Sequence, residues 1–138
     1  MPGPTIDDCR LIPLPKISGP RGNLTFVEFG RHVPFAPKRV FYLYDVPAGQ
    51  SRGAHAHREL HQVIVALGGG FDVLLDDGGG RRTVHLASPA EGLYIPPMIW
   101  SAESNFAPGS VCLVLASEFY DEAEYIRDYG AYLAAVRK

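Results

Sequence analysis

The sequence predicts a single all-β domain, a small barrel or sandwich that carries one C-terminal helix. Its 138 residues suffice for one hydrophobic core and include 15 glycines and 12 prolines. These residues are spread along the whole chain, as is typical of many short strands joined by turns. Only the last stretch, from residue 121, changes to apolar positions that recur every three or four residues, which indicates a helix.

Short β-prone segments follow one another between the turns. The proline-rich residues 1–20 are expected to form an arm or an edge strand. In residues 39–45 the alternation places Tyr42 and Tyr44 on one face and Phe41 on the other. The expected strands are residues 24–29, 39–45, 52–57, 61–67, 71–75, 81–86, 92–95, 98–102 and 110–116. An Asp/Gly-rich break between the fifth and sixth of these predicts a hairpin.

The C-terminal helix is expected to begin at Asp121 and to pack against the outside of the β-body. Asp121, Glu122 and Glu124 in its first turn suit the positive end of a helix, and Arg137 and Lys138 suit the opposite end. Its apolar residues at helical spacing are Tyr125, Ile126, Tyr129, Tyr132, Leu133 and Val136.

Charge and composition restrict the classes of function. A net charge of −2 gives no reason to expect nucleic acid or an anionic membrane surface as a partner. No apolar run is long enough to suggest a membrane span, and the first residues do not resemble a signal peptide. Cys9 and Cys112 are far apart and unpatterned, so no disulfide is expected. We therefore expect a soluble, cytoplasmic protein.

Two histidines offer the strongest chemical signal. His55 and His57 are spaced i, i+2 in an expected strand, so their side chains point to the same face. On the inside of a small barrel, both imidazoles would enter one cavity. Such a pair indicates either a metal site or proton transfer near neutral pH.

The order of glycines and histidines resembles the first motif of a cupin, a double-stranded β-helix or jelly-roll barrel. Gly49, His55, His57 and a glycine of residues 68–70 fit that motif. Gln62 stands where the motif has an acidic metal ligand. The resemblance implies a cupin-type barrel with an incomplete ligand set.

The second cupin motif is also incomplete. Gly92, Pro96 and Pro97 are retained, but residues 98–101 contain no histidine. First-row divalent metals in such pockets need three or four nitrogen or oxygen ligands. We therefore predict no bound metal, and we expect proton-transfer chemistry such as that of an isomerase, an epimerase or a dehydratase.

Further candidates would hold a substrate around the two histidines. Arginine grips a diphosphate in a planar fork, and aromatic rings can line a sugar or nucleobase pocket. The candidate binding residues are Arg52, Arg21, Tyr42, Tyr44, Arg39, Gln62, Trp100 and Ser101. The other histidines, His32, His61 and His85, are expected to be structural.

Several stretches in matching order resemble the sugar 3,4-ketoisomerase family. They cover roughly residues 20 to 133, nearly the whole chain. The matching stretches are 21–24, 38–42, 52–57, 75–78, 92–95, 114–117, 120–122 and 125–129.

This resemblance implies action on dTDP-4-dehydro-6-deoxy-D-glucose, whose ketone moves from C4 to C3 during deoxyamino-sugar biosynthesis. It also implies an enzyme without metal or cofactor, and a homodimer that exchanges its N-terminal strands, residues 1–20.

A mechanism joins the resemblance to the residues. We expect His57 to remove the C3 proton and His55 to deliver a proton to C4, through an enediolate. Arg52 and Arg21 would hold the diphosphate or the enediolate oxygens, and Tyr42 or Tyr44 would line the sugar pocket. The family commonly has a basic residue where this chain has Ser101, so the C4 configuration of the product is open. Arg21 favours a galacto product over a gluco one.

Other functions stay open at this point. A dTDP-sugar 3,5-epimerase also transfers protons next to a ketone, but it inverts carbon centres without moving the ketone. A non-catalytic cupin module would bind a nucleotide sugar without turnover. A metal-dependent dioxygenase ranks last.

Overall fold

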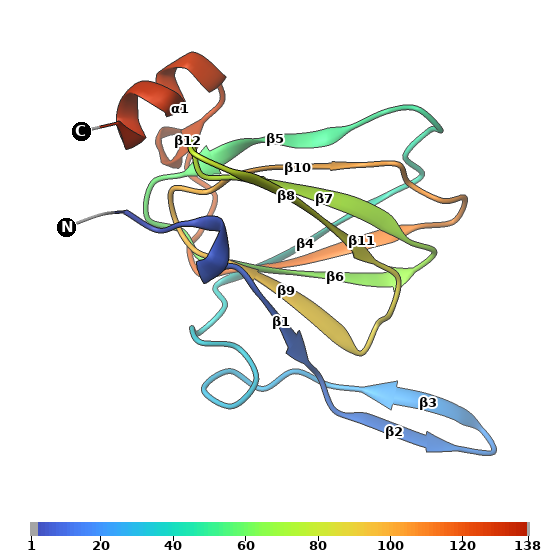
Figure 1. The fold of residues 1–138 in the computed structure, drawn as a ribbon. Helices are drawn as coiled ribbons and strands as arrows, with labels where there is room; N and C mark the ends of the chain where they lie inside the picture. Colours follow the sequence, from blue (N-terminus) through green and yellow to red (C-terminus); the bar gives the residue numbers. More distant parts are fainter. Residues whose placement is uncertain (1–2, 138) are drawn as a thin grey trace.

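The computed structural model describes residues 3–137 as two five-stranded antiparallel sheets packed face to face, with a hairpin that projects from them (Figure 1). The first sheet has the order β1 (Arg10–Pro13), β9 (Glu91–Ile95), β6 (Gln62–Gly68), β11 (Val111–Ala116) and β4 (Arg39–Tyr44). The second has the order β12 (Tyr125–Ile126), β5 (Arg52–His57), β10 (Trp100–Ser104), β7 (Phe71–Asp76) and β8 (Arg81–Leu86). The all-β prediction is confirmed.

The remaining elements are short. The projecting hairpin consists of β2 (Lys16–Gly19) and β3 (Gly22–Thr25). The helical elements are η1 (Ile6–Asp8), η2 (Glu122–Glu124) and α1 (Tyr129–Val136). None of the helices within residues 3–137 is long and apolar enough to cross a membrane.

The main core lies between the two sheets. Alternating positions of β7 and β9, such as Phe71, Val73 and Leu93, point inward and are fully buried. Strand β6 is buried on both faces, because residues 26–37 and the arm cover the outside of the first sheet. The two sheets thus bring β5, β6, β10 and β11 around one interior space.

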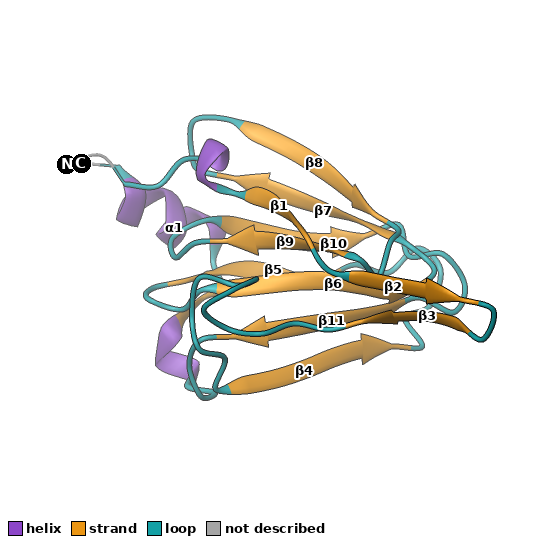
Figure 2. Cartoon of the chain, turned by 90° about the horizontal axis from the view of Figure 1, so that it is seen from below, coloured by secondary structure: helices purple, strands orange, loops and turns teal. Residues whose placement is uncertain are grey.

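The helix α1 lies at one end of the strands (Figure 2) and packs against residues of β5, β10 and β12 in the second sheet. Tyr132 is fully buried there and packs against Trp100, with ring centroids 5.6 Å apart. Its hydroxyl lies 2.9 Å from the carbonyl oxygen of Met98 and 3.0 Å from that of Asp76. The expectation that the helix packs outside the β-body is confirmed.

The expected start of this helix is wrong. Asp121 caps only the single turn η2, where its side chain accepts from the amide of Ala123. The next residues, β12, pair with the edge of β5, and Asp128 caps α1 by accepting from the amide of Ala131. Sheet pairing therefore interrupts a run whose spacing resembles one continuous helix.

Two strand boundaries also differ from the prediction. The strand expected at 24–29 ends at Thr25, and the following residues cover the first sheet as a loop. The strand expected at 98–102 begins at Trp100, because Met98 adopts a left-handed backbone conformation with a φ of 65°. The hairpin expected between 71–75 and 81–86 is confirmed as β7 and β8.

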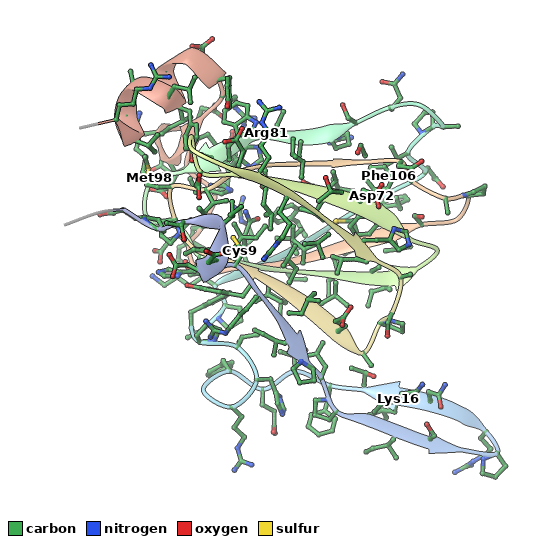
Figure 3. The ribbon with its side chains drawn as sticks, in the orientation of Figure 1. Cys9, Lys16, Asp72, Arg81, Met98 and Phe106 are labelled. Atoms are coloured by element: carbon green, nitrogen blue, oxygen red, sulfur yellow. The ribbon has the colours of Figure 1, made fainter. Side chains whose placement is uncertain are left out.

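The N-terminal arm pairs within its own chain. Strand β1 pairs with β9, and the hairpin β2–β3 extends away from the barrel, as the place of Lys16 in Figure 3 illustrates. Ile17 and Leu24 are exposed on this hairpin. Cys9 and Cys112 are both buried, and neither forms a disulfide in this structure.

Candidate active site

A cavity of about 260 Å³ opens between the two sheets, at the edge formed by β5 and β12. Apolar side chains of β4 and β11 form one wall: Phe41, Leu43 and Val114. The polar side chains that line the cavity are Arg52, His55, Gln62, Ser101, Glu103, Tyr125 and Arg127. A cavity of about 590 Å³ beside α1 has only Asp7 and Asp77 as charged lining residues, so it is unsuited to a phosphate.

The two histidines of β5 form a hydrogen-bonded pair. Their Nε2 atoms are 3.1 Å apart, so one ring donates to the other. His55 lines the cavity, whereas His57 lies behind it and is only 4% exposed. Both Nδ1 atoms are buried without a hydrogen-bond partner in the described chain.

Burial keeps both imidazoles neutral. It lowers the pKa of His55 to about 4, with a smaller contribution from the positive charge of Arg127. It lowers the pKa of His57 to about 3, assisted by His55 and Arg39. At neutral pH the pair can therefore accept a proton, which is the requirement for a general base.

Arg52 reaches the same face as His55 through an irregularity in β5. Arg52 pairs with Glu103 and His55 with Ser101, so β5 uses one residue more than β10 over this stretch, which is a β-bulge. Gly53 takes up the extra residue with a φ of 73°. The backbone conformation therefore favours glycine, and a Cβ atom there would lie 2.7 Å from Oε2 of Glu103, so the carboxyl group would have to shift.

Tyr125 packs against both imidazoles from β12. Its ring centroid lies 4.8 Å from that of His55 and 4.5 Å from that of His57. Arg39 donates to its hydroxyl over 3.3 Å, and the guanidinium of Arg127 lies 4.3 Å from its ring centroid. Strand β12 thus fixes the orientation of the histidine pair. This role is not predicted from the sequence, because the spacing of residues 125–126 indicates a helix.

Glu103 is a buried carboxyl group that the sequence interpretation missed. Glu103 is 6% exposed and lines the cavity, and its carboxyl group makes no hydrogen bond within residues 3–137. Burial raises its pKa to about 7, although the positive charge of Arg52 opposes this shift. The alternation of β10 could have revealed it, since Glu103 shares a face with Ser101.

The structure brings part of the predicted binding set together. Arg52, Gln62 and Ser101 line the cavity with His55. Arg39 lies one layer behind, beside Tyr125, where its Nε is buried and unpaired within the described chain.

The rest of the predicted set lies elsewhere. Tyr42 and Tyr44 are 58% and 61% exposed on the outer face of β4, because its inward positions are taken by Phe41 and Leu43. Trp100 belongs to the core beneath α1. Arg21 lies at the turn of the projecting hairpin, away from the cavity of its own chain.

The other histidines have local partners, as their structural interpretation requires. His61 Nδ1 lies 2.7 Å from the hydroxyl of Tyr94, and His85 Nδ1 lies 2.8 Å from a carboxylate oxygen of Asp72. His32 accepts from the amide of Glu28 in a turn. Within residues 3–137, no group of three or more His, Cys, Asp or Glu side chains is placed to hold a metal ion.

Comparison with known proteins places this site in context. The family model described as FdtA, WxcM-like, C-terminal, matches residues 7–137. A TDP-4-oxo-6-deoxy-alpha-D-glucose-3,4-oxoisomerase from Aneurinibacillus thermoaerophilus is 41% identical over 129 residues, which cover 94% of this chain and 93% of that protein.

Solved structures of sugar 3,4-ketoisomerases are similar to this chain in both fold and sequence. The WlaRB TDP-quinovose 3,4-ketoisomerase from Campylobacter jejuni is 42% identical, with a TM-score of 0.89 and coverage of 94% of this chain and 99% of that one. A histidine-to-asparagine variant of the QdtA 3,4-ketoisomerase from Thermoanaerobacterium thermosaccharolyticum, in complex with TDP-4-keto-6-deoxyglucose, is 38% identical. Its TM-score is 0.91 and the match covers 93% of each chain.

Proposed function

Because the chain belongs to the FdtA family and is a cupin-type sugar 3,4-ketoisomerase, we propose that its substrate is dTDP-4-dehydro-6-deoxy-D-glucose. The observation that carries this proposal is the pair of neutral imidazoles, 3.1 Å apart, at one cavity. The names of the relatives, which act on or bind TDP-linked keto sugars, supply the substrate class.

Proton transfer begins at His55 in this mechanism. His55 faces the cavity and His57 lies behind it, which favours reversing the roles expected from the sequence. The C3 proton is acidic because of the neighbouring C4 ketone, and the neutral His55 removes it. His57 orients His55 through the Nε2 contact, and the two rings share the positive charge that develops.

Cations at the cavity hold the charged parts of the substrate. Arg52 lines the cavity close to Glu103, and its guanidinium can bind a diphosphate or an enediolate oxygen there. Arg127 lines the same cavity. We further propose the homodimer with exchanged arms, in which β1 pairs with β9 of the second copy in place of its own, and the exposed hairpin carries Arg21 to the cavity of that copy.

The stereochemistry favours a galacto product. The C3 hydrogen of the gluco substrate and the C4 hydrogen of a galacto product lie on the same face of the sugar ring. One imidazole that removes the first proton and returns a proton to C4 therefore produces galacto. Ser101, at the position where the family commonly has a basic group, does not titrate and so does not serve the opposite face.

Replacement of His55 tests the function. ¹H NMR in D₂O with dTDP-4-dehydro-6-deoxy-glucose should give a 3-keto product that carries deuterium at C4, and its H4 coupling distinguishes galacto from gluco. His55→Asn should lower kcat at least ~10³-fold, because His55 is the one imidazole among residues 3–137 that lines the cavity. Binding of the substrate by wild type without any turnover would favour the non-catalytic module, and inversion at C3 and C5 would favour the epimerase.

A further inference from the structure

Glu103 occupies a position that is unusual for a carboxyl group. It lies on β10, and its oxygens pack under the bulge at Gly53, within 2.8 Å of where a Cβ atom would stand. It is 6% exposed, and no hydrogen bond within residues 3–137 uses its side chain. The carboxyl group lines the cavity and has no partner among the described residues, so a group that enters the cavity can bind it directly.

The other polar groups of the cavity do not replace it. The amide of Gln62 and the hydroxyl of Ser101 do not titrate near neutral pH. Arg52 and Arg127 stay charged and have no proton to give. His55 is engaged with the carbon-bound proton in the proposed function, on which this inference rests.

The reaction needs a second proton carrier, because protons must also move between two oxygens. In the substrate O4 is a carbonyl oxygen and O3 carries a proton. In the product O3 is the carbonyl oxygen and O4 carries the proton. The group that serves both must give a proton and then take one back.

We propose that Glu103 is this catalytic residue, the acid that protonates O4 and the base that removes the proton from O3. In the first step His55 takes the proton from C3, and the electrons of the C–H bond form the C3=C4 double bond. The π electrons of the C4 carbonyl move to O4, which receives the proton of Glu103. In the second step the Glu103 carboxylate takes the proton from O3, and the C3=O double bond forms. The π electrons of the C3=C4 bond then take the proton of His55 at C4. Glu103 and His55 end in their starting states.

The surroundings of Glu103 support this double role. Arg52 faces it from β5 and favours the carboxylate, whereas burial favours the acid. The Cys112 thiol of β11 is also close, and burial raises its pKa far above neutral, so it adds no charge. The opposing effects leave the pKa of Glu103 at about 7, where both of its forms are accessible.

The test replaces Glu103 by glutamine, which keeps the size and the hydrogen-bonding capacity but carries no transferable proton. The glutamine amide still donates a hydrogen bond to O4 and so supports removal of the C3 proton, but it cannot take the proton from O3. In D₂O, Glu103→Gln should therefore lower the rate of isomerisation at least ~10²-fold, while deuterium still enters C3 of the recovered substrate within ~10-fold of the wild-type rate. His55→Asn should lose both reactions. Glu118→Gln, at a partly exposed glutamate that pairs with Lys38, is the matched control and should retain wild-type activity.

Two further measurements keep the test independent of folding. The wild-type kcat should fall as pH rises through about 7, because the first step needs the acid form of Glu103. Glu103→Asp, which keeps a carboxyl group, should recover part of the lost rate.

Several outcomes overturn the assignment. Isomerisation by Glu103→Gln within threefold of wild type does so while the proposed function stands. The assignment is also overturned if a folded Glu103→Gln variant loses C3 exchange and isomerisation to the same extent and its kcat still falls as pH rises through about 7. A wild-type protein that neither isomerises the sugar nor exchanges C3 overturns both the assignment and the proposed function.

Discussion

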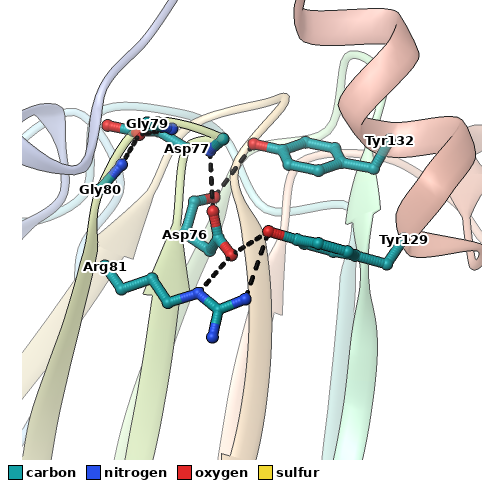
Figure 4. Close-up of polar contacts among 8 residues, drawn as sticks. Asp76, Asp77, Gly79, Gly80, Arg81, Tyr129 and Tyr132 are labelled. Atoms are coloured by element: carbon teal, nitrogen blue, oxygen red, sulfur yellow. Dashed lines mark hydrogen bonds and ion pairs between the residues drawn. The ribbon is translucent and has the colours of Figure 1, made fainter.

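Two buried carboxyl groups of the second sheet differ in their surroundings. Asp76, at the end of β7, is 2% exposed and accepts hydrogen bonds from the amide of Gly78, Nε of Arg81 and the hydroxyl of Tyr129 (Figure 4). The side chain of Glu103, on the neighbouring β10, makes no hydrogen bond within residues 3–137.

The contrast distinguishes Asp76, whose carboxylate has a structural role, from Glu103, whose carboxyl group we propose to act in catalysis. Every donor around Asp76 is provided by the protein, and through Tyr129 these bonds tie α1 to the hairpin β7–β8. Glu103 faces a cavity that a substrate can fill. The hydrogen bonds of Asp76 stabilise the fold, whereas the carboxyl group of Glu103 is open to a group that binds in the cavity.

Removal of Asp76 should give the largest effect on stability. Asp76→Ala leaves three donors without their acceptor, and we expect a loss of about 3 kcal/mol in the free energy of unfolding. Thermal denaturation followed by circular dichroism measures it. Arg81→Ala is the comparison variant: Arg81 is 63% exposed, so its removal should cost less than ~1 kcal/mol. Equal losses for the two variants would contradict this account of the network.

Substitution at the bulge should have an intermediate effect. Gly53→Ala adds a Cβ atom 2.7 Å from the Glu103 carboxylate and forces alanine into a left-handed conformation, at a cost of about 2 kcal/mol. In the Glu103→Ala background the clash disappears, so the same substitution should cost only about 1 kcal/mol. A double-mutant cycle in urea measures the difference. An unchanged cost would show that the backbone conformation alone requires glycine.

The pH dependence of stability should show the smallest effect. Burial raises the pKa of Glu103 to about 7, so the folded protein binds a proton that the unfolded chain releases, and stability falls as pH rises towards 7. The lowered pKa values of His55 and His57 act in the opposite sense, because stability falls as pH drops below 6.5.

Comparison with Glu103→Gln isolates the glutamate. The difference in unfolding free energy, wild type minus variant, should decrease by about 1 kcal/mol between pH 6 and pH 7. Urea titrations at several pH values measure it. A constant difference would mean that Glu103 is already ionised throughout this range.

The alternation of side chains along the expected strands predicted more of the fold than of the site. The spacing of β4 separated Tyr42 and Tyr44 from Phe41 correctly, but it did not indicate which face is internal. The pair His55 and His57 followed from the same rule and does meet at the cavity.

The remaining features of the site depend on structural irregularities that neither strand alternation nor helical spacing predicts. Arg52 and His55 are three residues apart, which in a regular strand places them on opposite faces; the bulge at Gly53 reverses this. Tyr125 lies in a run with helical spacing, and only its pairing with His57 across 68 residues of chain makes it a strand residue.

The late position of β12 in the sequence has a consequence for synthesis of the protein. Until residues 125–126 leave the ribosome, the edge of β5 has no partner, and Tyr125 is missing from beside the imidazoles. A chain terminated before this point would expose an open sheet edge, which favours aggregation over partial activity. Completion of the histidine site and protection of the sheet edge thus occur together, when β12 pairs with β5.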